Sequence, residues 1–86
     1  MNLIFQALEV HGSYDDGGAL HWERTAQVSP IMALAGLGLH DDAASVDQVT
    51  EAAGQLGWRL LDVERRGGRC NVHLQRPSVP SRPHRR

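Results

Sequence analysis

The segment 45–77 constrains the fold more than any other part of the sequence. It opens with Ser45-Val46-Asp47-Gln48, a capping-box pattern in which the serine hydroxyl accepts from one free helix amide and the glutamine side chain accepts from another. The apolar residues that follow share one face of a helix: Val46, Val49, Ala53 and Leu56. We therefore expect a helix that begins at Ser45 and ends at Gly57, a glycine of the kind that terminates helices.

Two strands joined by a tight turn are predicted after this helix. Residues 58–64 are rich in β-compatible types, and residues 69–76 alternate, with Cys70, Val72 and Leu74 on one side and Asn71, His73 and Gln75 on the other. Gly67-Gly68 supplies the positive φ angles of a tight hairpin. Pro77 ends the second strand, because proline has no N–H for the ladder.

The first half of the chain predicts another hairpin and a short apolar segment. Residues 3–11 alternate as a central strand, residues 12–18 carry turn signals, and residues 19–28 show the clearest alternation in the sequence. Residues 31–39 are apolar almost throughout and contain glycines, which predicts one or two helical turns. The expected fold is α+β: a small antiparallel sheet of about four strands with one main helix packed on one face, in the order ββαββ, plus the apolar insert.

The pattern Gly54-x-x-Gly57-Trp58-x-Leu60-Leu61, with a hairpin that ends in Leu74-Gln75-Arg76-Pro77, resembles the ending of a family of short bacterial and phage domains of unknown function. Members of that family end in a helix, a Gly-Trp-Glu-Leu-Val strand and a final Lys-Arg-Pro or a similar sequence. Arg59 stands where the family usually has an acidic residue. The resemblance implies a compact α+β domain with an antiparallel sheet. It implies no site residues, because the function of the family is undefined.

Length and composition predict one domain. The chain has 86 residues, of which 41% are hydrophobic, and we expect residues 1–77 to form a compact domain and residues 78–86 a disordered basic tail of arginine and proline. No apolar run approaches the roughly 18 residues of a membrane span, and the first residues lack the basic region and cleavage site of a signal peptide. We expect a cytoplasmic protein that does not bind a membrane. Its single cysteine, Cys70, should be a buried, inert thiol.

The charges are strongly separated along the chain. Residues 1–64 carry ten acidic residues and two arginines, a net charge of −8, whereas residues 65–86 carry seven arginines and no acid, a net charge of +7. The guanidinium group pairs in a bidentate manner with phosphate and carboxylate. The overall pI near 6.5 argues against a dedicated nucleic-acid domain. The residues predicted to contact an anion or a nucleic acid are Arg65, Arg66, Arg69, Arg82, Arg85 and Arg86.

No motif in the sequence predicts catalysis or a cofactor. We find no nucleophile elbow and no paired-carboxylate motif. Two groups of residues could supply metal ligands, although neither has a recognised spacing: His40, Asp41 and Asp42, and His11, Asp15, Asp16 and His21. We therefore expect a protein that is not an enzyme and that holds neither a metal nor another cofactor.

The apolar insert 31–39 suggests a protein interface instead. It holds more apolar side chain than a small domain easily covers, and exposed patches of this kind mark interaction sites. The alternative is that the insert simply covers the sheet. We predict a small accessory or inhibitor-type binding protein of phage or mobile-element type, by analogy, with a protein partner or a second copy at Ile31, Met32, Leu34 and Leu37. The alternative function is nucleic-acid contact through the carboxyl-terminal arginines.

Overall fold

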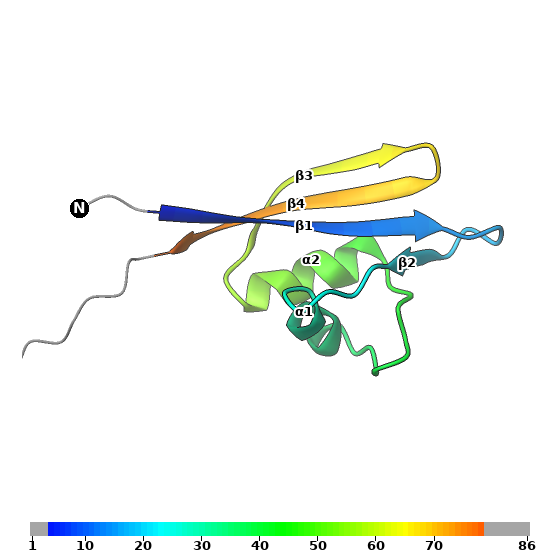
Figure 1. Ribbon diagram of the computed structural model, residues 1–86, viewed down its shortest axis with the longest axis horizontal. Helices are drawn as coiled ribbons and strands as arrows, with labels where there is room; N and C mark the ends of the chain where they lie inside the picture. Colours follow the sequence, from blue (N-terminus) through cyan, green and yellow to red (C-terminus); the bar gives the residue numbers. More distant parts are fainter. Residues whose placement is uncertain (1–3, 79–86) are drawn as a thin grey trace, which may run out of the picture.

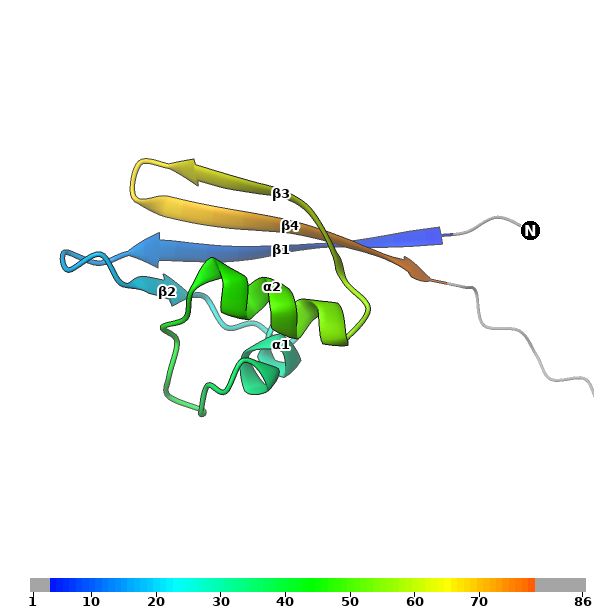
Figure 2. The same cartoon turned by 180° about the vertical axis from the view of Figure 1, so that it is seen from behind.

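The computed structural model describes residues 4–78 and shows two layers, a four-stranded antiparallel sheet and two helices on one of its faces (Figures 1 and 2). The strand order is β2-β1-β4-β3. The elements are β1 (Ile4–Tyr14), β2 (Leu20–Trp22), α1 (Ser29–Leu34), α2 (Val46–Gln55), β3 (Arg59–Arg66) and β4 (Arg69–Ser78). The predicted α+β class is confirmed. Two helices separate the strand pairs, where the sequence predicts one main helix and a short insert.

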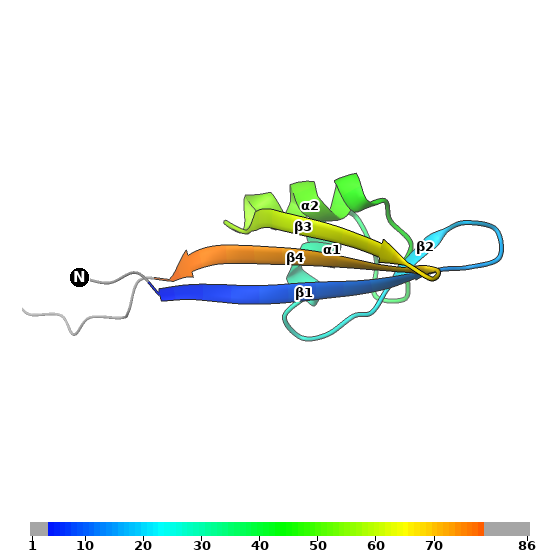
Figure 3. The ribbon, with the colours of Figure 1, turned by 90° about the horizontal axis from the view of Figure 1, so that it is seen from above.

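The central pair of the sheet is β1 with β4, which also has the longest pairing. It runs from Ile4 opposite Ser78 to Ser13 opposite Arg69, and seen from above the two strands lie side by side along the length of the molecule (Figure 3). The molecule is elongated, 57 × 26 × 18 Å. β1 is an inner strand of the sheet, as predicted.

The strand predicted over residues 19–28 is wrong beyond Trp22. β2 pairs with β1 over three residues only, and after the bond from the Glu23 N–H to the carbonyl of His11 (2.8 Å) the chain leaves the sheet. The Val28 N–H then bonds to the carbonyl of Thr25 in a turn that leads into α1. Val28 is nonetheless buried from this loop, whereas Ala26, the other apolar residue of the stretch, is exposed.

The helix α2 begins as the sequence predicts. The Gln48 N–H donates to Ser45 Oγ at 3.1 Å, and the Ser45 N–H donates to Gln48 Oε1 at 2.9 Å, which completes the capping box. Gly57 has φ +89°, and the Trp58 N–H bonds back to the carbonyl of Ala53 at 3.0 Å. Gly57 therefore ends the helical segment and directs Trp58 toward β3.

The core lies between the sheet and the helices. From the sheet come alternate residues of β1 and β4, including Val10, Val72 and Cys70, and α2 contributes Val49 and Ala53. The Trp22 indole N–H donates to the carbonyl of Ala44 at 2.9 Å, so the largest core side chain also has its polar atom satisfied. Cys70 is buried, as expected.

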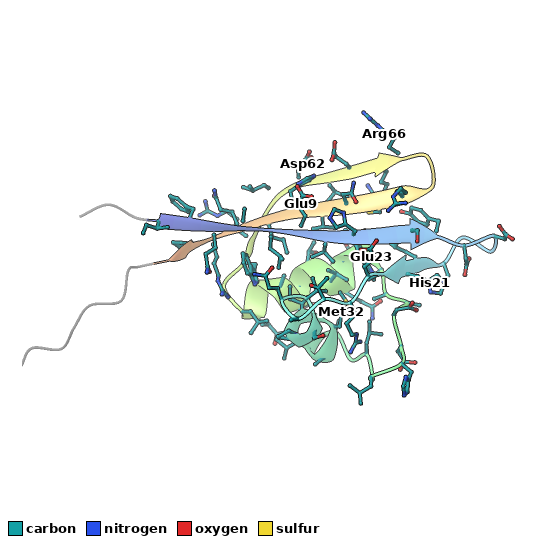
Figure 4. All side chains as sticks on the ribbon, viewed as in Figure 1. Glu9, His21, Glu23, Met32, Asp62 and Arg66 are labelled. Atoms are coloured by element: carbon teal, nitrogen blue, oxygen red, sulfur yellow. The ribbon has the colours of Figure 1, made fainter. Side chains whose placement is uncertain are left out.

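The opposite face of the sheet is uncovered and mostly polar, with Phe5 as an exposed apolar residue on it. His73 on β4 lies between Glu9 on β1 (3.3 Å) and Glu64 on β3 (2.9 Å), and His11 Nδ1 lies 2.7 Å from Asn71 Oδ1. Figure 4 shows Asp62 and Arg66 projecting on this side, away from Met32 on the helix side. The hydrogen bond between His73 and Glu64, together with the nearby negative charge of Glu9, raises the pKa of His73. This face is held together by side-chain contacts between strands.

Candidate functional site: a pocket below one end of the sheet

The structure separates the four residues predicted to form a protein interface. Ile31 and Met32 are 0% and 1% exposed and belong to the core, so neither side chain reaches the surface. Leu37 is partly buried against the core, whereas Leu34 is 46% exposed. The prediction for Ile31 and Met32 is thus corrected: these two residues face the sheet, because α1 covers the core.

Three of the six predicted anion-binding arginines belong to the part of the chain that the structure describes. Arg65, Arg66 and Arg69 flank the β3–β4 turn and are exposed, and Arg66 stands directly opposite Arg69 in the ladder. Arg65 Nε lies 3.4 Å from the Tyr14 hydroxyl, and Arg69 lies 3.8 Å from Glu23. The turn therefore carries a small positive patch. The remaining three residues are outside the described part of the chain: Arg82, Arg85 and Arg86.

The two groups of histidine and aspartate residues that could supply metal ligands are not kept apart in the structure, because His21 of one group contacts Asp42 of the other. His21 bonds to Asp15 through Nε2 (2.7 Å) and to Asp42 through Nδ1 (2.8 Å), which uses both ring nitrogens and raises the pKa of His21. His11 contacts Asn71 instead. Within residues 4–78, no group of three or more histidine, cysteine, aspartate or glutamate side chains could hold a metal ion. The Asp15–His21–Asp42 contact connects the β1–β2 turn to the loop before α2.

Sequence reasoning missed a pocket at the opposite end of the sheet. Its volume is about 300 Å³. It is lined by Gln6, Ala7, Gln27, Pro30, Leu56, Trp58 and Arg76. Gln6 pairs with Arg76 in the ladder. Neighbouring residues of the two strands, such as Glu9 and His73, point to the uncovered face at odd-numbered positions, so the even-numbered Gln6 and Arg76 point to the helix side. Trp58 and Leu56 come from the segment that joins α2 to β3, and Pro30 comes from α1.

Arg76 is held in this pocket by neutral groups. Its guanidinium carbon lies 4.2 Å from the centre of a Trp58 ring, in a cation–π contact. Nε donates to Gln6 Oε1 at 2.8 Å, and Nη1 donates to the carbonyl of Leu56 at 3.1 Å. The ion pairs formed among residues 4–78 involve other residues, and none includes Arg76. The pocket therefore contains a fixed positive charge without a neutralising carboxylate.

A second recess, of about 400 Å³, lies near Tyr14, Leu20 and Ala44. No charged residue lines it, and the hydroxyl of Ser45, the residue before α2, already caps that helix. It therefore lacks the convergent polar groups that give a binding site its specificity. We take the first pocket, here called the Trp58–Arg76 pocket, as the candidate functional site.

A comparison with protein-family models, curated proteins and solved structures finds no match to this chain. The resemblance carried by residues 54–77 therefore stays a prediction. Within residues 4–78, neither helix has the length and apolar character needed to cross a membrane.

Proposed function

We propose that this protein is a non-enzymatic binding module whose Trp58–Arg76 pocket receives a carboxylate group of a protein partner. One observation carries the proposal: the guanidinium of Arg76 is fixed in a pocket by an aromatic ring, an amide and a backbone carbonyl, with no acid beside it. A fixed guanidinium loses little conformational freedom when it binds, and it pairs with carboxylates through two parallel hydrogen bonds.

The walls of the pocket suit an amino-acid side chain. Trp58, Leu56 and Pro30 offer apolar surface for the methylene groups of a glutamate or aspartate, while the carboxylate reaches Arg76. Gln27 is a further hydrogen-bonding group on the wall, suited to a peptide amide. A volume of about 300 Å³ accommodates a side chain with part of its backbone.

The partly exposed end of the apolar insert adjoins this site. α1 contributes Pro30 to the pocket and carries Leu34, which is exposed, with Leu37 just beyond its end. Leu34 and Leu37 thus remain the residues of the insert 31–39 that extend the interface in this proposal. In this proposal the protein is a small accessory or inhibitor-type protein of the cytoplasm, such as a phage accessory protein, and it acts through this surface.

The test is an NMR titration with N-acetyl-glutamate N-methylamide and with its glutamine counterpart. We expect the indole N–H resonance of Trp58 to shift with the glutamate compound, while that of the buried Trp22 stays in place as an internal control. Arg76→Gln should abolish the shift, and Arg59→Gln, which removes an exposed arginine paired with Gln75 on the neighbouring strand, should preserve it. Equal shifts with both compounds, or a shift that survives Arg76→Gln, would refute the proposal.

A second candidate function, contact with nucleic acid, is favoured by the pair Arg66 and Arg69. Like charges directly opposite each other destabilise a ladder, and a bound phosphate would relieve that repulsion. The test is light scattering and fluorescence anisotropy with duplex and single-stranded DNA at low and high salt. Binding that weakens with salt and with Arg66→Gln would support this function. Binding whose affinity does not change with salt concentration would contradict this second function.

A further inference from the structure

The edge of β1 is open next to the Trp58–Arg76 pocket. β2 covers β1 only at Gly12, Ser13 and Tyr14, so the stretch from Ile4 to Val10 has a strand neighbour on the β4 side alone. Figure 3 shows how far β1 extends beyond the short β2. An uncovered strand edge is a template for another strand.

The backbone groups on this edge can be assigned from two hydrogen bonds. The Tyr14 N–H donates to the carbonyl of Gly68, on the β4 side, whereas the carbonyl of His11 accepts from Glu23, on the β2 side. Because antiparallel pairing alternates along a strand, the even-numbered residues of β1 bond to β4 and the odd-numbered residues face outward. Phe5, Ala7 and Glu9 therefore each direct one N–H and one C=O outward, and no backbone group within residues 4–78 pairs with them.

The other edge of the sheet is protected in the usual ways. β3 has an irregularity in its pairing between Leu60 and Asp62, and bulges and charged side chains both discourage edge-to-edge pairing. The charged residues along β3 are Arg59, Asp62, Glu64, Arg65 and Arg66. The free stretch of β1 has only Glu9 as a charged residue, with no proline and an uninterrupted register to β4. One edge of this sheet is therefore blocked and the other is left available.

We propose that the partner of the Trp58–Arg76 pocket is an extended peptide segment that pairs as a fifth strand with β1 over Ile4 to Leu8 and presents an acidic side chain opposite Gln6. This inference rests on the proposed function, which supplies the carboxylate. It adds the conformation of the partner, its position and the pattern of its residues. Strand addition of this kind obtains affinity from main-chain hydrogen bonds and specificity from pockets for alternate side chains.

The geometry of an added strand brings the acid to Arg76. The position opposite Gln6 is a pair without hydrogen bonds on this side, for which Cα atoms are about 4.5 Å apart and the two side chains point the same way. Gln6 lines the pocket and bonds directly to Arg76 Nε, so a glutamate opposite Gln6 has the guanidinium within reach.

The neighbouring positions on the same side of the added strand lie opposite Ile4 and Leu8. Ile4 is 54% exposed at this end of β1, so an apolar residue opposite it would cover part of its side chain. The partner segment should therefore have the pattern apolar-x-acid-x-apolar, in which x is a residue of any type.

The experiment uses the acetylated, amidated peptide Val-Thr-Glu-Thr-Val and its variant with glutamine at the centre. Strand addition makes every second amide of the peptide face β1. We therefore expect N-methylation of each β1-facing amide to weaken binding about tenfold, the loss of roughly one hydrogen bond with its steric cost, while N-methylation of the intervening amides has little effect. The Ala7→Pro variant removes one outward N–H from the protein, and its thermal unfolding shows whether the ladder to β4 survives.

The outcomes separate the two proposals. Binding that requires the glutamate and Arg76 but tolerates every N-methyl group would leave the pocket function standing and overturn strand addition. Binding that ignores Arg76→Gln would overturn the pocket function itself. Light scattering on the protein alone decides the remaining case: a dimer that Ala7→Pro converts to a monomer would show that a second copy occupies this edge, and would overturn the assignment to a partner peptide.

Discussion

Replacing Gly12 by alanine tests how closely the sheet is packed. Gly12 lies opposite Trp22, and a Cβ atom added there would lie 2.9 Å from Trp22 Cε3 and 3.0 Å from Leu20 Cδ1. The indole cannot move away freely, because Trp22 is 3% exposed and its N–H is bonded to the carbonyl of Ala44. Relief therefore requires a shift of the ring or of β2. Overpacking of this kind costs about 1–3 kcal/mol.

Gly54→Ala is the matched control, and it should raise the free energy of unfolding where Gly12→Ala lowers it. Gly54 lies in the last turn of α2, and a Cβ atom added there would meet nothing within 4 Å. The substitution should stabilise the protein by roughly 0.5–1 kcal/mol, through the lower entropy of the unfolded chain and the better helix propensity of alanine. No contact in the structure explains why a glycine stands at this position.

Urea unfolding monitored by tryptophan fluorescence measures both effects. With a slope of about 1 kcal/mol per molar urea, as for other small domains, the midpoint should fall by about 1 M or more for Gly12→Ala and rise by about 0.5–1 M for Gly54→Ala. An unchanged or raised midpoint for Gly12→Ala would show that Trp22 and Leu20 yield without cost, and would refute the reasoning. A lower midpoint for Gly54→Ala would refute the control.

Three further predictions concern single side chains. Ser45→Ala removes the helix cap and should lower the free energy of unfolding by about 1 kcal/mol; an unchanged urea midpoint would mean that water replaces the hydroxyl without loss. The Cys70 thiol, being buried, should react with a thiol reagent only as fast as the protein opens, and far faster in urea; rapid labelling of the native protein would contradict its burial. For His73, contact with Glu64 raises the histidine pKa above 6.5 and lowers the glutamate pKa below 4.5, so their mutual stabilisation is greatest between these values. It is lost as the pH rises through the histidine pKa or falls through the glutamate pKa, and His73→Gln should flatten this dependence in unfolding curves at pH 3–9; a His73→Gln curve as steep as that of the wild type would assign the dependence to other groups.

Local rules predict the carboxyl-terminal half of the fold well. The capping box at Ser45 and Gln48, the turn at Gly67 and Gly68 and the alternation around Val72 each depend on a few neighbouring residues, and each is confirmed. The residues after Trp22 mislead because their apolar residues stand at alternate positions without pairing in a strand: they form a loop that buries Val28 and leaves Ala26 exposed.

The pocket was beyond the reach of such rules because it depends on register. Counting outward from the β3–β4 turn, where Arg66 pairs with Arg69, would place Arg59 opposite Arg76. The irregularity between Leu60 and Asp62 shifts the pairing, so that Arg59 lies opposite Gln75 and Trp58 reaches Arg76. One inserted residue thus creates the cation–π contact of the site, and no signal in the sequence marks its position.

The pairing of Ile4 with Ser78 has a consequence for how the protein forms on the ribosome. β4 comes after the other described strands in the chain and lies between β3 and β1, so β3 and the β1–β2 pair cannot join into one sheet until β4 emerges. Contacts between residues this far apart in sequence slow folding, because a long loop must close before they stabilise anything. The apolar residues of β1 therefore cannot be fully buried until nearly the whole domain has been synthesised. This nascent chain should depend on chaperones for longer than a helical protein of equal length.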